Sequence, residues 1–252
     1  MPLPLNPPPP ITGTILSMAH ASGNKWVDEV SGVTWKCGFN KTPFGTAGKP
    51  KITVEDNPRV ADRPYLQLDK LTRVYTDNLP DNITLSEDFT VTIRLKCTDD
   101  DNPFYIFSTS IFSSVAGLQA FYSTINHTIY SYNTGPNNSF NFTFVKLTKD
   151  VWHHIAFTRK NGAYYMFIDG IVIDWTGATF TPIGNKSIST SPPEDPYTSI
   201  KSYDEIVLIK GQALWPDTVP PGINIKIFEP NDIDFAYTVK PYKMEDPTIK
   251  IY

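Results

Sequence analysis

Apolar and polar residues alternate along much of the middle of this chain. From Phe89 to Cys97 every second residue is apolar, and threonine, arginine and lysine fill the positions between them. Because neighbouring side chains of a strand point to opposite faces, this alternation predicts an antiparallel strand with one buried and one solvated face. Phe140, Phe142 and Phe144 repeat the pattern. Shorter runs of the same kind predict strands at 105–112, 118–122, 129–132 and 206–209.

Residues 152–175 predict two consecutive β-hairpins. Three runs rich in β-branched and aromatic residues, at 152–159, 163–168 and 171–175, are separated by short turns. The turns are Asn161-Gly162 and Asp169-Gly170. These dipeptides favour type I′ turns, whose central residues need a positive φ that glycine adopts freely and Asn or Asp better than most. Many short strands joined by such turns predict an all-β, antiparallel sandwich.

The two ends of the chain differ from this middle part. Six of the first ten residues are proline, and a further set of prolines is scattered among aromatic residues after position 229. Proline fixes φ and lacks an N–H, so the first stretch is expected to be extended and to stay out of a sheet interior. We expect arms at 1–27 and 222–252 that either fold back on a sandwich of 28–221 or dock on neighbouring subunits. The docking residues in that case are Pro7, Pro8, Pro9, Pro10, Phe235, Tyr237 and Tyr242.

Composition narrows the partners that the sequence predicts. The chain has 252 residues, of which 40% are hydrophobic and 19% charged, which is enough for one large core. A net charge of −4 without a lysine or arginine cluster argues against nucleic-acid and polybasic membrane partners. The N-terminus has no signal-peptide pattern and no stretch has the length of a transmembrane helix, so synthesis in a cytosol is expected. The two cysteines, Cys37 and Cys97, make a single disulfide possible.

Acidic residues and histidines show no catalytic pattern. The acidic pairs are adjacent in sequence, as in Glu87-Asp88, so a strand sends their carboxylates to opposite faces and not to one acid–nucleophile site. His153 and His154 alternate in the same way and lack a further ligand at metal spacing. The sequence therefore predicts a protein that is not an enzyme, and histidines that belong to the structure of a strand.

Several motifs also follow one another in a characteristic order. A strand opens with Trp152-His153-His154, and the apolar strand after it ends at Asp169-Gly170. Segments at 31–35, 63–68, 88–96 and 203–215 supply further elements. In this order they resemble the laminin-G/concanavalin-A-like sandwich superfamily over roughly residues 28–221. The closing Lys-Gly, Ala, aromatic and Pro-Pro pattern at 210–221 is similar to versions in bacteriophage virion proteins. The polar stretch 184–202 departs from the family and is expected to be an exposed insertion.

The resemblance implies a jelly-roll, concanavalin-A-like sandwich and two kinds of function. The first is a non-enzymatic virion protein made in the host cytoplasm, most simply a capsid decoration or head-surface protein. It would dock through its arms on capsid or tail subunits, in a homo-oligomer or multi-copy assembly. The second is a receptor- or carbohydrate-binding module of a tail fibre or cell-surface protein. For a glycan, Tyr197 and Tyr203 are the expected contacts, because aromatic faces at a sandwich rim stack on sugar rings.

The same superfamily raises calcium as a cofactor. Related sandwiches sometimes bind calcium at the rim, and the run Asp99-Asp100-Asp101-Asn102 offers oxygen ligands. Calcium needs six or more oxygens, usually from several loops, and this run supplies a fraction of them. A solvated turn between strands is therefore the favoured interpretation of the run, with calcium as the alternative.

Overall fold

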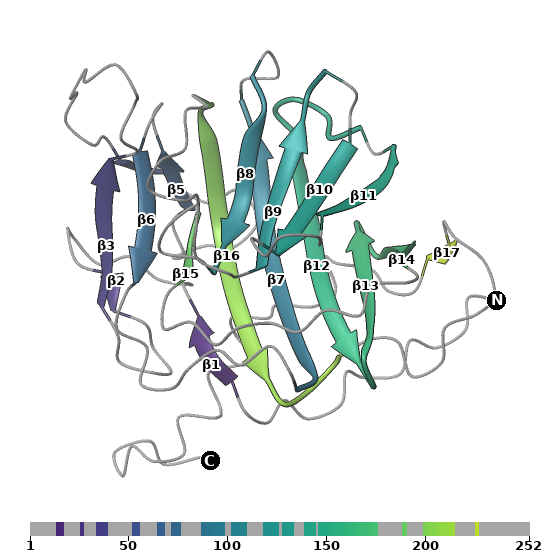
Figure 1. The fold of residues 1–252 in the computed structure, drawn as a ribbon. Helices are drawn as coiled ribbons and strands as arrows, with labels where there is room; N and C mark the ends of the chain where they lie inside the picture. The colour runs from purple at the N-terminus through teal and green to yellow at the C-terminus, as the bar shows by residue number, and fades with distance from the viewer. Residues whose placement is uncertain are drawn as a thin grey trace, which may run out of the picture.

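Two antiparallel sheets face each other in the computed structural model of this chain (Figure 1). The structure describes residues 14–17, 26–27, 34–39, 52–55, 65–68, 72–76, 87–98, 102–109, 118–125, 128–133, 139–144, 146–175, 188–190, 199–214 and 225–226. These residues form strands, turns and connections, and no helix occurs among them. The predicted all-β, antiparallel architecture is thus confirmed for the described part of the chain.

The nine-stranded sheet contains both predicted hairpins. Its strands are β1 (Thr14–Ser17), β4 (Ile52–Glu55), β5 (Tyr65–Leu68), β7 (Phe89–Cys97), β12 (Trp152–Lys160), β13 (Ala163–Ile168), β14 (Ile171–Trp175), β16 (Lys201–Lys210) and β17 (Ile225–Lys226). They lie in the order β17-β14-β13-β12-β7-β16-β5-β4, and β1 also pairs with β16. β1 and β17 belong to the segments expected as arms, and both pair with strands of the sandwich.

The eight-stranded sheet forms the opposite wall. Its strands are β2 (Trp26–Val27), β3 (Thr34–Phe39), β6 (Thr72–Thr76), β8 (Phe104–Ser108), β9 (Leu118–Ser123), β10 (Thr128–Asn133), β11 (Ser139–Phe144) and β15 (Ile188–Ser189). They lie in the order β11-β10-β9-β8-β15-β6-β3-β2. The short strand β15 therefore fills the position between β8 and β6.

This placement of β15 corrects the expectation of an exposed insertion at 184–202. Thr190 and Ser202 are fully buried at 0% exposure, and Ser199 is 2% exposed. Thr190 forms two hydrogen bonds with Val74 of β6: Val74 N donates to Thr190 Oγ1 at 3.1 Å, and Thr190 N donates to Val74 O at 3.0 Å. The described residues of this polar stretch are thus part of the sandwich, where the hydroxyl groups of Thr190 and Ser199 find backbone partners.

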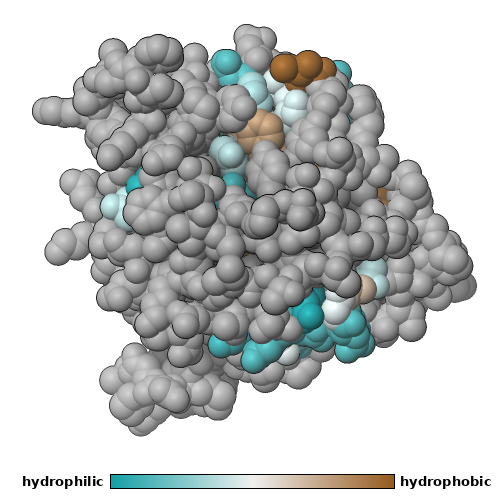
Figure 2. Space-filling model, viewed as in Figure 1, coloured by the Kyte–Doolittle hydropathy of each residue, from teal (hydrophilic) through white to brown (hydrophobic). Residues whose placement is uncertain are grey.

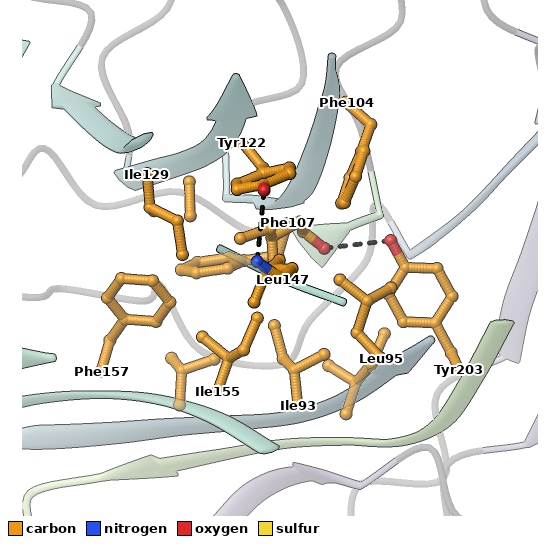
Figure 3. Packing of buried hydrophobic residues seen from close by; sticks show 14 of the residues in the cluster. Ile93, Leu95, Phe104, Phe107, Tyr122, Ile129, Leu147, Ile155, Phe157 and Tyr203 are labelled. Atoms are coloured by element: carbon orange, nitrogen blue, oxygen red, sulfur yellow. Dashed lines mark hydrogen bonds between the residues drawn. The ribbon is translucent and has the colours of Figure 1, made fainter. Parts of the chain in front are cut away.

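The inner faces of the two sheets share one hydrophobic core (Figure 3). Alternate residues of β7 and β12 point into it, among them Ile93, Ile155 and Phe157. Phe107 of β8 meets Phe157 across the sheets, with ring centroids 5.2 Å apart. Burying side chains of this size contributes roughly 1.5–3 kcal/mol each, so this layer supplies the main stabilisation of the sandwich.

Both hairpin turns have the backbone conformation that the sequence predicts. Asn161 and Gly162 have φ values of 51° and 83°, and Asp169 and Gly170 have 50° and 77°. Positive φ at both central residues is the mark of a type I′ turn. The flanking strands, Trp152–Lys160, Ala163–Ile168 and Ile171–Trp175, agree with the predicted ranges to within one residue.

The outer face of the nine-stranded sheet is buried where the alternation predicts a solvated face. Thr90, Thr92 and Arg94, the polar positions of β7, are 0%, 0% and 4% exposed. The chain after β16 crosses this face: Thr90 Oγ1 donates to Gln212 O at 3.1 Å and accepts from Leu214 N at 2.9 Å. The expectation of a solvated side of β7 is therefore wrong, because further chain packs against it.

Candidate functional site

A row of side chains crosses the outer face of the nine-stranded sheet near one end. The registers of β5, β16, β7 and β12 pair Gln67 with Ser202, Ser202 with Lys96, and Lys96 with Trp152. Directly opposed residues of antiparallel strands point to the same face, so these side chains leave the sheet on one side. Tyr65 lies two residues before Gln67 on β5 and shares that face.

Tyr65 and Trp152 meet above the two strands that separate them. At a strand spacing of about 4.8 Å, β5 and β12 are about 14 Å apart. The two ring centroids are nevertheless 5.2 Å apart, at an interplanar angle of 79°. Both side chains must therefore lean across β16 and β7. Their edge-to-face geometry is a favourable one for aromatic rings.

Lys96 lies next to both rings. Its Nζ is 4.9 Å from the centroid of Tyr65 and 5.3 Å from that of Trp152, within the range of cation–π attraction. Among the described residues, no carboxylate forms an ion pair with this ammonium. Tyr65, Lys96 and Trp152 are half-buried, so each residue keeps part of its surface in contact with solvent. We refer to these three residues as the aromatic–lysine cluster.

The surroundings of the cluster are sealed from solvent although the cluster is not. Ser202, in register with Lys96, is 0% exposed, and its Oγ has no hydrogen-bond partner among the described residues. Arg94 and His154, the next outward positions on β7 and β12, are 4% and 1% exposed. A buried hydroxyl without a protein partner is expected to bond to water or to a ligand.

The loop 146–151 places an exposed apolar residue beside the cluster. Asp150 N donates to Cys97 O at 2.8 Å, which fixes the loop to the end of β7. Val151, directly before Trp152, is 45% exposed, and Ile125 in the β9–β10 turn is 88% exposed. This end of the sandwich is uppermost in Figure 1, and Figure 2 shows hydrophobic surface there and hydrophilic surface at the lower end of the described part.

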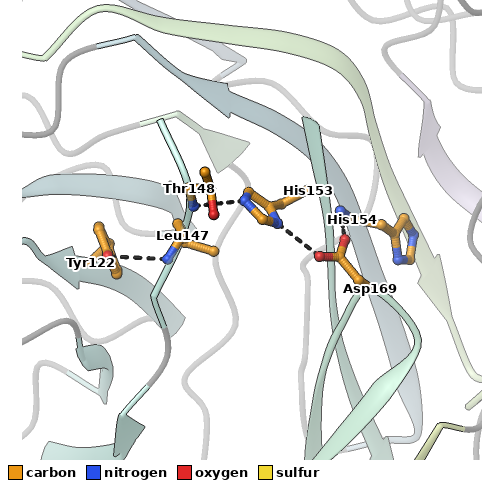
Figure 4. Close-up of polar contacts among 6 residues, drawn as sticks. All are labelled: Tyr122, Leu147, Thr148, His153, His154 and Asp169. Atoms are coloured by element: carbon orange, nitrogen blue, oxygen red, sulfur yellow. Dashed lines mark hydrogen bonds and ion pairs between the residues drawn. The ribbon is translucent and has the colours of Figure 1, made fainter. Parts of the chain in front are cut away.

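His153 points to the inner side of β12 and joins a hydrogen-bond network with the β13–β14 turn (Figure 4). Its Nδ1 lies 2.8 Å from Asp169 Oδ2, and Thr148 N donates to its Nε2 at 2.9 Å. His154 N donates to Asp169 Oδ1 at 2.9 Å, and Asp169 N donates to His154 O at 2.8 Å. The network ties the loop 146–151, the start of β12 and the turn together.

These bonds define what His153 can do. Because its Nε2 accepts a bond from a backbone amide, the proton of the neutral ring lies on Nδ1, which donates to Asp169. The nitrogen that a general base would use is therefore occupied, and His153 is only 9% exposed. The histidine–aspartate pair thus fits a structural role, as the sequence predicts for these histidines.

Asp169 is electrostatically tuned by the same network. Burial raises the pKa of its carboxyl, but the hydrogen bonds from the His153 ring and the His154 amide, together with the electrostatic attraction of both histidines, outweigh burial. The pKa of Asp169 therefore lies below its ordinary value of 3.8. The carboxylate stays charged over the whole physiological range and continues to accept both bonds.

Tyr203 is not placed where a glycan contact requires it. It is 1% exposed, and its hydroxyl donates to Ile106 O at 3.2 Å inside the sandwich (Figure 3). The expectation that this ring contacts a sugar is therefore wrong, because no sugar reaches it. Tyr197 lies outside the described residues, and so do the expected docking residues of both arms, namely Pro7, Pro8, Pro9, Pro10, Phe235, Tyr237 and Tyr242.

The expected calcium run and the cysteines are described only in part. Of the run 99–102 the structure describes Asn102, whose backbone carbonyl accepts a bond from Ser199 Oγ at 3.0 Å. Within the described ranges, no three histidine, cysteine, aspartate or glutamate residues are grouped to hold a metal ion. Cys97 is a buried thiol and not half of a disulfide. No helix long and apolar enough to span a membrane occurs in the described part of the chain.

The aromatic–lysine cluster is not apparent from the sequence pattern. Tyr65, Lys96 and Trp152 come from three strands far apart along the chain, and the alternation marks Lys96 only as an outward residue. The strand order and register bring them together. A signal was present in part, since Trp152 opens a strand directly after the loop 146–151, where an aromatic residue lies close to the end of a sandwich.

Solved structures with a similar sandwich include toxin binding domains and a sialidase. The binding domain of botulinum neurotoxin serotype D aligns with a TM-score of 0.56 and 16% identity, over 80% of this chain and 48% of its own. The receptor-binding domain of botulinum neurotoxin type G gives 0.55 and 12%, over 95% and 53%. Trypanosoma rangeli sialidase in complex with the inhibitor DANA gives 0.52 and 16%, over 79% and 30%.

Identities of 12–16% show a shared fold and nothing finer. This chain spans about half the length of the toxin binding domains, at 48% and 53%, and 30% of the sialidase. No protein-family model matches the chain. No curated protein is similar to it in sequence. The chain therefore shares a β-sandwich fold with these binding domains and the sialidase, and its function depends on its own residues.

Proposed function

We propose that this chain is a non-enzymatic binding module that recognises a carbohydrate at one end of its sandwich. The observation that carries the proposal is the aromatic–lysine cluster. Partly exposed aromatic rings offer apolar faces that stack on sugar rings, and binding sites combine such faces with a few placed polar groups. The exposed Val151 extends the apolar surface beside Trp152.

The structural neighbours support the class of function. One is named a receptor-binding domain, and binding domains of botulinum neurotoxin DC are described in complex with rat synaptotagmin II and with SialylT. Those ligands belong to the toxins, and the fold they share with this chain carries many functions. The finer description of the fold, a jelly-roll of the concanavalin-A-like and laminin-G-like kind with two terminal arms, is part of the same proposal.

A binding role also agrees with the chemistry of the described acidic and histidine residues. Nε2 of His153, the nitrogen that a general base would use, accepts a hydrogen bond from the backbone amide of Thr148. Asp88, of the acidic pair Glu87-Asp88, accepts a bond from Asn161 N at 2.8 Å and lies 3.9 Å from Arg159 Nη1. These groups hold turns and strands together, and none of them is arranged as an acid–base pair across a cleft.

A glycan array probed with the purified chain tests the proposal. We expect selective binding to a subset of oligosaccharides, and its loss in Trp152→Ala. Tyr75→Ala is the matched control, because Tyr75 is also a half-buried aromatic ring in contact with a cation, with Arg73 Cζ 4.4 Å from its centroid. Binding that Trp152→Ala retains, or binding to no oligosaccharide, would contradict the proposal.

A virion location remains a second proposal that rests on the sequence. It combines the resemblance to bacteriophage virion proteins with the proline-rich segment at positions 1–10, and a capsid decoration protein is its simplest form. The toxin and sialidase neighbours lend it no support. Deleting residues 1–10 should abolish incorporation into particles and leave the thermal unfolding of the sandwich unchanged. Normal incorporation of the shortened chain would refute docking through that arm.

A further inference from the structure

We infer that the aromatic–lysine cluster selects acidic sugars, with Lys96 contacting a carboxylate while Tyr65 and Trp152 hold the sugar ring. The inference deepens the proposed carbohydrate binding and rests on it. Its physical basis is a cation that lies beside two aromatic rings in contact with each other. The ammonium lies 4.9 Å and 5.3 Å from the two ring centroids, so a ligand that touches the rings also comes within reach of the charge.

The ring contacts leave hydrogen-bonding capacity on Lys96. A lysine ammonium has three N–H donors, and an aromatic face attracts the charge without offering a lone pair. Within the described part of the chain no carboxylate forms an ion pair with it. A sugar carboxylate supplies both the negative charge and the lone pairs, and such charge-assisted bonds are stronger than bonds to a neutral hydroxyl.

One neighbour in the same row adds a polar group for sugar hydroxyls, and a second lies buried beneath the site. Gln67 is half-buried and in register with Ser202, which in turn is in register with Lys96. Ser202 is 0% exposed and its Oγ has no hydrogen-bond partner among the described residues. Because buried hydroxyls are nearly always bonded to protein, water or ligand, and a sugar does not reach this one, we expect a water beneath the cluster to bond it.

Other anionic ligands fit less well. A nucleic acid would need a basic surface that neutralises several phosphates, and this chain has a net charge of −4. One lysine beside two rings matches a single carboxylate on a ring-shaped ligand. The site therefore fits a sialylated or uronic-acid-containing oligosaccharide better than a polyanion.

The test compares acidic and neutral oligosaccharides with matched lysine variants. The probes are sialylated and glucuronic-acid-containing oligosaccharides and the same oligosaccharides without the acidic sugar. We expect the wild-type chain to bind the acidic members preferentially, and Lys96→Gln to weaken them about ten-fold, the equivalent of one charge-assisted bond. Lys96→Arg should restore the preference. Lys210→Gln removes the same charge at the far end of β16 and should change nothing.

The outcomes distinguish failure of the acidic-sugar preference from failure of carbohydrate binding as a whole. Equal binding of acidic and neutral members, or an acidic preference that Lys96→Gln retains, would overturn the inference and leave carbohydrate binding in place. Binding to none of the probes would overturn the proposed function itself. Thermal unfolding of each variant shows that the sandwich is intact, and the Lys96→Arg variant distinguishes loss of charge from loss of packing.

Discussion

The carboxylate of Asp169 should make a large contribution to the stability of the second hairpin, and Asp169→Ala measures it. The substitution removes the acceptor of the His153 ring and of the His154 amide, at 2.8 Å and 2.9 Å. The Asp169 side chain is 43% exposed, so water replaces part of the loss. We therefore assign about 1 kcal/mol to each bond, the low end for a charged acceptor. Alanine at a φ of 50° adds about 1 kcal/mol of backbone strain.

The expected loss of unfolding free energy is thus about 3 kcal/mol, measured by urea denaturation near neutral pH. Asp150→Ala is the matched control, because Asp150 has a similar φ of 58° and no bond of its carboxylate is present among the described residues. That control should lose about 1 kcal/mol. If Asp169→Ala is no less stable than Asp150→Ala, the side-chain network contributes nothing and the reasoning fails.

Three further predictions concern stability. Asp169 has a lowered pKa, so its contribution to folding stability is complete well above pH 3.8 and is lost as the pH falls through 3.8 towards the lower pKa of the folded state. The melting temperature of Asp169→Asn should therefore fall less with acid than that of the wild type, and parallel acid profiles would contradict this. Tyr203→Phe should cost about 1–2 kcal/mol in urea denaturation, because it leaves the Ile106 carbonyl buried without the hydroxyl that bonds it at 3.2 Å; an unchanged midpoint would show that the carbonyl has another partner. Gly162→Ala should cost about 1 kcal/mol from backbone strain alone, because Gly162 has a φ of 83° and the nearest side-chain atom lies 3.9 Å from the added carbon. Gly211→Ala, at a φ of 78° with open space around it, should cost the same, and a much larger loss at Gly162 would indicate a clash instead.

The parts of the fold that were predictable are those in which local pattern and tertiary environment agree. β7 alternates over nine residues, and its apolar positions are the ones that join the hydrophobic core. The hairpin turns are specified by Asn161-Gly162 and Asp169-Gly170, because few other dipeptides accept two consecutive positive φ values. The strands β2, β15 and β17 have two residues each, too few to show a period.

Tyr203 shows how a single irregularity defeats a pattern. Ile206 and Leu208 point into the core, so strict alternation would send Tyr203 to the outer face. The register of β16 against β7 slips between Tyr203 and Glu205, and this bulge returns Tyr203 to the inner face. The bulge in β8 at Ile106 leaves a carbonyl out of step with β9, and the Tyr203 hydroxyl bonds it.

The two candidate polar sites differ in how far the sequence could have revealed them. Counting back from the Lys160–Ala163 pair across the first turn sets His154 opposite Asp169, so part of that network was within reach of the pattern. The aromatic–lysine cluster was not, because it depends on the order β5-β16-β7-β12. That order is a long-range property of the sandwich, and no local signal encodes it.

The most direct test of the account is whether a bound sugar contacts Trp152. The measurement is a nuclear magnetic resonance titration of the ¹⁵N-labelled chain with the acidic oligosaccharide that binds most tightly on the array, with the Trp152 indole signal assigned from Trp152→Phe. We predict a saturable shift of that indole N–H, while the Gly162 amide at the opposite end of β12 stays in place. Saturable binding that moves other signals and leaves the Trp152 indole unchanged would place the site elsewhere and contradict the account.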